Sequence, residues 1–187
     1  MRVPFNYLPM QFNDTNKIFA SWKKLIKTSD FTFGQKMIEF EKKFAKFIRV
    51  KYCISTNNGT DALILSIMPV HWGGASPTMS KVMKIAKKYN IHVVEDACMG
   101  IGSRINKKSP GTFGIVNAFS MHPLKSLNVM GDGGMVVTNN KKIAEWLRKF
   151  RNHGMVDRDH IDFWGVNWRL QPLQAVVALE GLKKERS

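Results

Sequence analysis

The stretch from Phe119 to Gly134 reads Phe-Ser-Met-His-Pro-Leu-Lys-Ser-Leu-Asn-Val-Met-Gly-Asp-Gly-Gly, and a valine-rich run follows it as far as Thr138. Its one lysine, Lys125, lies between the hydroxyl of Ser120 and the glycine-rich turn. A lysine in a poorly hydrated pocket beside other cations loses its proton more easily and becomes a nucleophile toward aldehydes. The stretch therefore predicts a strand, a loop with an imine-forming lysine and a returning strand. The alternative is that Lys125 is a solvated lysine in a lysine-rich chain.

A phosphate-binding turn is predicted between a strand and a helix earlier in the chain. Tyr-Cys-Ile-Ser (52–55) is a short β-prone run, Thr-Asn-Asn-Gly-Thr-Asp (56–61) is a turn, and Ala-Leu-Ile-Leu (62–65) is apolar. Free backbone N–H groups and the helix dipole at the start of a helix favour a phosphate. The same residues are also ordinary helix-capping chemistry, so this turn is a candidate site only in combination with others.

A strand that ends in two carboxylates is predicted from Ile-His-Val-Val-Glu-Asp-Ala (91–97). Ligands of open α/β sheets bind beyond the carboxyl ends of the strands. Glu95 and Asp96 are therefore candidate site residues, although a strand-end acid can equally lie on the surface. A fourth polar stretch, Gly-Val-Asn-Trp-Arg-Leu (165–170), precedes an apolar helix expected over residues 172–182.

Taken in this order, the motifs resemble those of the DegT/DnrJ/EryC1/StrS family of sugar aminotransferases, which carry pyridoxal 5'-phosphate (PLP) on a type I aminotransferase fold. The resemblance runs from Phe33-Gly34 to Gln174 and includes Pro-Val-His (69–71) and Arg-Asn-His-Gly (151–154). Several dispersed motifs in the right order are more specific than any one of them. The resemblance implies an α/β fold of three layers with a mostly parallel sheet, which is the large domain of that fold, truncated.

The resemblance also implies a role for each matching residue. Lys125 would bind PLP through its amine and move protons at the substrate carbon, and Asp96 would pair with the pyridine nitrogen so that the ring can accept electrons. The cofactor phosphate would be held by Gly59, Thr60, Asp61 and Ser120. Asn167 would reach that phosphate from the second subunit of a homodimer. Lys125 and Asp96 are thus the expected catalytic residues.

The chain departs from the family pattern in three places. Met99 stands where the family usually has a glutamine that contacts the phenolic oxygen of PLP, and a thioether cannot donate a hydrogen bond. Between Met68 and Pro69 about two βαβ units, on the order of 60 residues, are missing, together with the aromatic residue that stacks on PLP. After Leu182 the smaller C-terminal domain of the family does not follow. We therefore expect residues 1–187 to form a partial PLP-binding large domain.

Hydrophobic periodicity predicts helices that begin near Asn13, Gln35, Pro77, Lys141 and Pro172. The first should bury one face that consists of Ile18, Phe19, Trp22, Leu25 and Ile26. The second should bury Met37, Phe40, Phe44 and Phe47. The third should bury Met79, Val82, Met83, Ala86 and Tyr89. These apolar stripes are more typical of a core than of a ligand site.

Charge is the unusual feature of the composition, because 29 basic residues against 14 acidic ones give a net charge of +15. Such an excess suggests a polyanion as partner. The lysines are scattered, however, and no helix-turn-helix, RNP or zinc-knuckle pattern accompanies them. We therefore expect no specific nucleic acid, and only a weak attraction for diphosphate-bearing sugars. The histidines lack a metal-ligand spacing, so we predict no metal.

The cellular setting is predicted from cysteines and from apolar runs. Cys53 and Cys98 form no CxxC motif or disulfide framework, which favours a reduced compartment. The N-terminus lacks the apolar region of a signal peptide, and no apolar run reaches the length of about 18 residues that a membrane span needs. We therefore expect a cytoplasmic protein that does not bind a membrane.

The function that the resemblance implies is PLP-dependent transfer of an amino group from glutamate or glutamine to a keto-sugar, usually nucleotide-linked, in amino-sugar or surface-polysaccharide biosynthesis. Relatives that dehydrate sugars have a histidine in place of the lysine, so Lys125 argues against dehydration. Two alternatives stay open. One is an inactive, internally deleted fragment that at most binds PLP or a partner subunit, and the other is a basic polyanion-binding protein.

Overall fold

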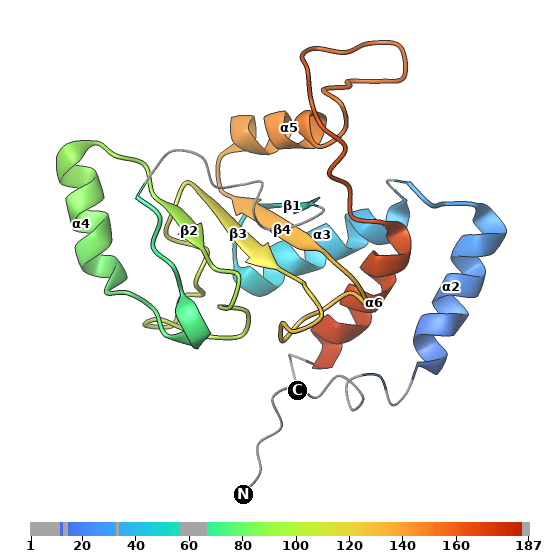
Figure 1. Cartoon of the computed structure of the whole chain (residues 1–187), viewed down its shortest axis with the longest axis horizontal. Helices are drawn as coiled ribbons and strands as arrows, with labels where there is room; N and C mark the ends of the chain where they lie inside the picture. The colour runs from blue at the N-terminus through green and yellow to red at the C-terminus, as the bar shows by residue number, and fades with distance from the viewer. Residues whose placement is uncertain (1–11, 13–14, 33, 57–66, 185–187) are drawn as a thin grey trace, which may run out of the picture.

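A computed structural model of the chain describes residue 12 and residues 15–32, 34–56 and 67–184. Helices α2 (Asn16–Thr28) and α3 (Gln35–Ile48) precede strand β1 (Tyr52–Thr56). The elements that follow are η2 (Trp72–Gly74), α4 (Met79–Tyr89), β2 (Val94–Asp96), β3 (Val116–Ser120), β4 (Gly134–Thr138), α5 (Lys141–Phe150) and α6 (Pro172–Lys184). Figure 1 shows a central sheet with helices around it, which confirms the predicted α/β class.

The sheet has the strand order β1-β4-β3-β2. Strand β2 runs parallel to β3, whereas β4 runs antiparallel to both β1 and β3. Among the described strands, β1, β2 and β3 therefore point the same way and β4 alone is reversed. Beyond β2, Ile67 and Val70 form parallel bridges with Val93 and Asp96. The carboxyl ends of β2 and β3 consequently lie side by side. The sheet edge that these strand ends form is distinct from the lateral edges along β1 and along residues 67–71.

The main core lies between the sheet and the pair of helices α3 and α6. Phe40 and Phe44 of α3 are fully buried, and the Phe44 ring meets Phe119 edge-on at 5.3 Å between centroids. The strand residues Cys53, Phe119, Met135 and Val137 belong to the same cluster. The residues that alternate with them, Ile54, Ala118 and Val136, are buried on the opposite face, toward α5. Helices thus cover both faces of the sheet, as the three-layer prediction requires.

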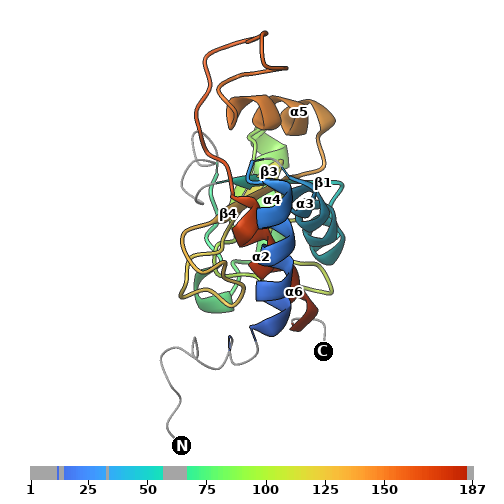
Figure 2. The ribbon, with the colours of Figure 1, turned by 90° about the vertical axis from the view of Figure 1, so that its right-hand side faces the viewer.

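Helix α2 packs on α6 at one end of the molecule, as Figure 2 shows. Ile18 and Leu25 are buried against Val176 and Val177, and the Trp22 indole donates a hydrogen bond to the Leu173 carbonyl at 3.0 Å. Phe19 and Ile26, predicted on the buried face, are instead about half exposed. The face of α2 that α6 covers is therefore narrower than the sequence predicted.

Helix α4 buries Met79 and Ala86 but not Tyr89, which is 61% exposed. The prediction that Tyr89 faces inward is wrong. Tyr89 lies at the last residue of α4, and the Lys88 ammonium sits 5.0 Å from its ring centroid, so the ring lies in a solvated and charged setting.

On the outer edge of β1, where the described residues place no further strand, an ion pair binds the backbone of Ser55. The Ser55 backbone N–H donates to Glu41 Oε1 at 2.8 Å, and the Ser55 carbonyl accepts from Arg151 Nη1 at 2.5 Å. Arg151 Nη1 also lies 2.6 Å from Glu41 Oε1, and both side chains are buried. The pair occupies the place of a neighbouring strand and limits pairing with other chains at this edge. Within the described residues, no helix is both long and apolar enough to cross a membrane.

Candidate functional site

Three of the predicted site residues lie at the edge where β2 and β3 end. Asp96 is the last residue of β2 and Ser120 is the last residue of β3. The Ala97 N–H donates to the Ala118 carbonyl at 2.9 Å, which keeps the two strands paired up to this point. Lys125 follows in the loop that joins β3 to β4. Residues far apart in the sequence therefore lie at the carboxyl ends of two adjacent strands or in the loop that follows.

The loop that carries Lys125 is ordered by short hydrogen bonds and by buried side chains. The Lys125 N–H donates to the His122 carbonyl at 2.9 Å, and the Met121 N–H donates to the Gly133 carbonyl at 2.8 Å across the base of the loop. Leu127 and Val129 are buried in the main core. Lys125 itself is half-buried. Because these hydrogen bonds and buried side chains lie on both sides of Lys125, they hold the lysine backbone at a defined position.

Cys98 links these residues electrostatically. The pKa of the Cys98 thiol is raised to about 12, first by burial and then by the hydrogen bond and negative charge of Asp96. The charge of Lys125 and a backbone hydrogen bond from Ser120 act on the pKa in the opposite direction. The Cys98 N–H contacts the Asp96 carboxylate and its thiol contacts the Ala118 carbonyl, so the charges of Asp96 and Lys125 both act on Cys98, which the sequence did not predict.

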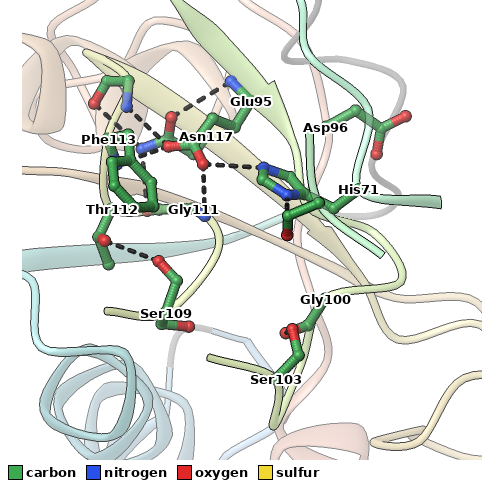
Figure 3. Close-up of polar contacts among 12 residues, drawn as sticks. His71, Glu95, Asp96, Gly100, Ser103, Ser109, Gly111, Thr112, Phe113 and Asn117 are labelled. Atoms are coloured by element: carbon green, nitrogen blue, oxygen red, sulfur yellow. Dashed lines mark hydrogen bonds and ion pairs between the residues drawn. The ribbon is translucent and has the colours of Figure 1, made fainter. Parts of the chain in front are cut away.

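Asp96 is held by the backbone of the preceding segment. Its N–H donates to the Pro69 carbonyl at 3.1 Å, and its carbonyl accepts from the His71 N–H at 3.0 Å. One carboxylate oxygen, Oδ1, accepts the Cys98 N–H at 3.0 Å. Figure 3 shows the Asp96 side chain pointing away from that of Glu95, as expected for consecutive residues of a strand.

Glu95 is the centre of a buried polar network on the other side of β2 (Figure 3). Its two oxygens accept backbone hydrogen bonds from Gly111, Phe113 and Gly114, at 2.9, 2.6 and 2.7 Å. The His71 Nε2 lies 2.9 Å from Glu95 Oε2, and the His71 Nδ1 lies 2.8 Å from Ser76 Oγ. Glu95 and His71 are both completely buried. The alternative of a surface acid is thereby excluded for Glu95.

Asn117 completes this network from β3. Its Oδ1 accepts the Glu95 N–H at 3.2 Å, and its Nδ2 donates to the Gly111 and Gly114 carbonyls. Gly111 has a φ of +78°, and a Cβ there would lie 2.4 Å from the Phe119 ring. Only glycine suits this position, where the loop curls around the Glu95 carboxylate.

The remaining predicted residues do not join this edge within the described structure. Asn167 is exposed, its Oδ1 accepts from Arg169 Nε at 2.8 Å, and it forms an isolated bridge with Asn152. It lies near the base of the loop between α5 and α6, which extends away from the sheet in both views (Figure 1 and Figure 2). Gly59, Thr60 and Asp61, the predicted phosphate turn, lie outside the described residues. Met99 is 40% exposed and follows Cys98.

The donor set at this edge suits an aldehyde cofactor that carries a ring nitrogen and a phosphate. Lys125 offers an amine for the aldehyde, Asp96 a carboxylate for a protonated ring nitrogen, and Ser120 a hydroxyl for a phosphate oxygen. In the described part of the chain, no group of three or more His, Cys, Asp or Glu side chains is arranged to hold a metal ion.

Comparisons with known proteins give a consistent picture. A model of the DegT/DnrJ/EryC1/StrS aminotransferase family matches residues 13–67 and 65–186. The UDP-N-acetyl-3-dehydro-alpha-D-glucosamine 3-aminotransferase of Acidithiobacillus ferrooxidans is 42% identical over 112 residues, which cover 60% of this chain and 30% of the relative. The structure of Streptomyces venezuelae DesV with a ketimine intermediate superposes with a TM-score of 0.91 and 25% identity, over 99% of this chain and 66% of DesV.

A second relative shows how the lengths differ. The UDP-2-acetamido-2-deoxy-3-oxo-D-glucuronate aminotransferase of Pseudomonas aeruginosa is 27% identical in an alignment of 228 positions, which covers 90% of this chain and 64% of the relative. Because 90% of 187 residues is fewer than 228, about 60 positions of the relative have no counterpart here. The chain thus spans less than two thirds of these relatives.

Proposed function

Because the chain belongs to the DegT/DnrJ/EryC1/StrS aminotransferase family, we propose that it forms the PLP-binding part of an enzyme that aminates a nucleotide-linked keto-sugar. The observation that supports this proposal is that Asp96 and Ser120 end two adjacent parallel strands and that Lys125 follows Ser120 in the next loop. The names of relatives, among them UDP-sugar and dTDP-sugar transaminases, support the substrate class. The net charge of +15 suits a substrate that carries a diphosphate.

Each residue would contribute a separate part of the mechanism. Bound PLP supplies the electron sink that amino transfer needs. The Lys125 amine would bind the cofactor covalently and, once the amino donor has displaced it, would remove and return the proton at the substrate carbon. The Asp96 carboxylate would keep the ring nitrogen protonated, because a neighbouring negative charge stabilises a cation.

Phosphate binding would fall to residues at the same edge and to a second copy of the chain. The Ser120 hydroxyl would donate to the phosphate together with the turn formed by Gly59, Thr60 and Asp61. Asn167 would reach the phosphate of the partner in a homodimer. Glutamate or glutamine would serve as the amino donor. Met99 can pack against the ring but cannot replace the hydrogen bond of a glutamine.

A second candidate is that residues 1–187 bind PLP without catalysing amino transfer. The positions of the Pseudomonas relative that have no counterpart here favour it. Under this reading residues 1–187 are a partial PLP-binding large domain, with the internal gap between Met68 and Pro69.

Borohydride reduction of the protein incubated with PLP, followed by peptide mapping, tests the proposal. The pyridoxyl label should appear on Lys125 and should vanish in Lys125→Arg, which keeps the charge. Lys108→Arg, in the exposed hairpin where Ile105 bridges Lys108, is the matched control and should leave the label unchanged. A label on another lysine, or none, would contradict the proposal. A polyanion-binding protein would give no specific label.

A further inference from the structure

The segment 67–71 contacts β2 both through its backbone and through the side chain of His71. Its backbone clamps Asp96, because the Asp96 N–H donates to Pro69 and the His71 N–H donates to the Asp96 carbonyl, at 3.1 and 3.0 Å. Its one imidazole, from His71, reaches to the other side of β2 and pairs with Glu95 at 2.9 Å. The residue that binds the backbone of Asp96 is therefore the same residue that binds the side chain of Glu95.

The Glu95 end of this connection is rigid. The carboxylate accepts three backbone N–H groups from residues 111–114 and is completely buried, so it cannot turn toward a different partner without losing them. Asn117 ties the same loop to β3. On the far side of the imidazole, Ser76 Oγ engages Nδ1 at 2.8 Å, so both ring nitrogens are occupied and the ring cannot flip freely.

The segment itself is short and lies at the lateral edge of the sheet, beside β2. Met68, Val70 and Trp72 are all exposed, whereas Pro69 and His71 are buried. Four backbone hydrogen bonds pair it with residues 92–96, and Ile67 packs against the apolar cluster of Met79, Ala86 and Val93. A short edge segment of this kind opens easily unless a side chain anchors it. At the end of the segment next to Asp96, the side chain that anchors it is the buried His71, through its hydrogen bond to Glu95.

We propose that His71 is a positioning residue for Asp96. Its hydrogen bond to the buried Glu95 fixes segment 67–71 against β2, and the backbone of this segment in turn holds the backbone of Asp96. The role of Asp96 toward the pyridine nitrogen rests on the proposed function, whereas the clamp itself does not. Because Glu95 and Asp96 face opposite sides of β2, His71 acts from the side of β2 opposite the Asp96 carboxylate (Figure 3).

The mechanical part of the proposal is tested without cofactor, by hydrogen exchange of the Asp96 amide. His71→Leu replaces the imidazole with an apolar side chain of similar size and so removes the hydrogen bond to Glu95. The Asp96 amide should then exchange at least about tenfold faster. His71→Gln places an amide nitrogen where it can still donate to Glu95 and should restore most of the protection. His92→Leu, on an exposed histidine two residues before β2, is the matched control. Unchanged exchange at Asp96 in His71→Leu would overturn the inference.

The chemical part is read from the protein loaded with PLP labelled at the ring nitrogen with nitrogen-15. The parent protein should show a protonated ring nitrogen, and His71→Leu should lose protonation by about tenfold, since a displaced carboxylate stabilises the cation less. A merely structural histidine would lower PLP affinity or the melting temperature without moving this nitrogen signal. If His71→Leu does not bind PLP, Ser76→Ala, which frees only the far side of the ring, must show the same direction of change, and an unchanged signal would overturn the inference.

The two proposals fail in different ways. If no pyridoxyl label reaches Lys125, the proposed function is wrong, while the exchange experiment still decides whether His71 clamps Asp96. If Lys125 is labelled and the ring nitrogen stays protonated in His71→Leu, the function stands and the positioning role of His71 is wrong.

Discussion

At the scale of single residues, Cys98 makes the electrostatics of the site measurable without any ligand. Its pKa of about 12 reflects burial first and then Asp96, with Lys125 acting in the opposite direction. A thiol with this pKa is almost fully protonated at neutral pH, and only the thiolate reacts with alkylating agents. The alkylation rate of Cys98 therefore reports the charges around it.

We predict that Asp96→Asn and Lys125→Gln change this rate in opposite directions. Loss of the Asp96 charge lowers the pKa of Cys98, so alkylation by iodoacetamide at mildly alkaline pH should become several-fold faster. Loss of the Lys125 charge raises the pKa, so alkylation should become slower. Peptide mass spectrometry separates Cys98 from the buried Cys53, and Asp132→Asn, an exposed acid in the glycine-rich turn, serves as control. Changes of the same sign in both variants would show that the three residues are not neighbours.

The residues at the sheet edge could be predicted from sequence because each lies in a motif with its own local signal. Asp96 and Ser120 end strands, and Lys125 follows in a loop bounded by proline and glycine. The pairing of His71 with Glu95 could not be predicted, because it joins residues 24 positions apart through a contact that only the folded sheet creates. The alternation along β2 did carry a usable signal, since it requires Glu95 and Asp96 to face opposite sides.

At the scale of elements, the edge of β1 depends on the buried pair of Glu41 and Arg151. We predict that Glu41→Gln lowers the free energy of unfolding by about 3 kcal/mol, since it leaves a buried guanidinium without its counter-charge. The measurement is equilibrium denaturation in urea.

Glu39→Gln in the same helix is the matched control for this prediction. Glu39 pairs with Lys36 and Lys43 at the surface, where an ion pair contributes at most about 1 kcal/mol. Equal losses in the two variants would mean that the β1 edge does not need the ion pair.

Helices and strands differ in how far the sequence predicted them. The periodicity of α3 correctly predicted that Met37, Phe40 and Phe44 are buried, because a helix needs only its own residues to define that face, whereas Phe47 is only partly buried. The parallel register of residues 67–71 with β2 could not be predicted in this way, because it depends on a partner far along the chain. The reversed direction of β4 is likewise a property of the sheet, because no local pattern distinguishes it from a parallel strand.

At the scale of the whole molecule, the family model matches in two parts that meet at residues 65–67, next to the segment that pairs with β2. Ile67 pairs with Val93 and Val70 with Asp96 in one continuous register, so the step from Met68 to Pro69 causes no slip against β2. The sheet from β1 to β2 is unbroken across the described residues. The chain therefore retains the edge that carries Asp96, Ser120 and Lys125.

We nevertheless predict that the 187-residue chain has negligible aminotransferase activity even where it binds PLP. By the resemblance to the family, the absent positions would include the aromatic residue that stacks on the cofactor, a contact that contributes about 0.5 to 1.5 kcal/mol beyond its area. A cofactor displaced by about 1 Å can lose on the order of a hundredfold in rate. Insertion of a segment from a relative between Met68 and Pro69 should raise the rate of the half-reaction with glutamate at least about a hundredfold, measured as the change in cofactor absorbance. A scrambled segment of equal length is the control, because it extends the loop without supplying the aromatic residue. Robust turnover of a keto-sugar by the parent chain would show instead that the edge formed by residues 67–71, with His71 locked on Glu95, is sufficient to position the cofactor.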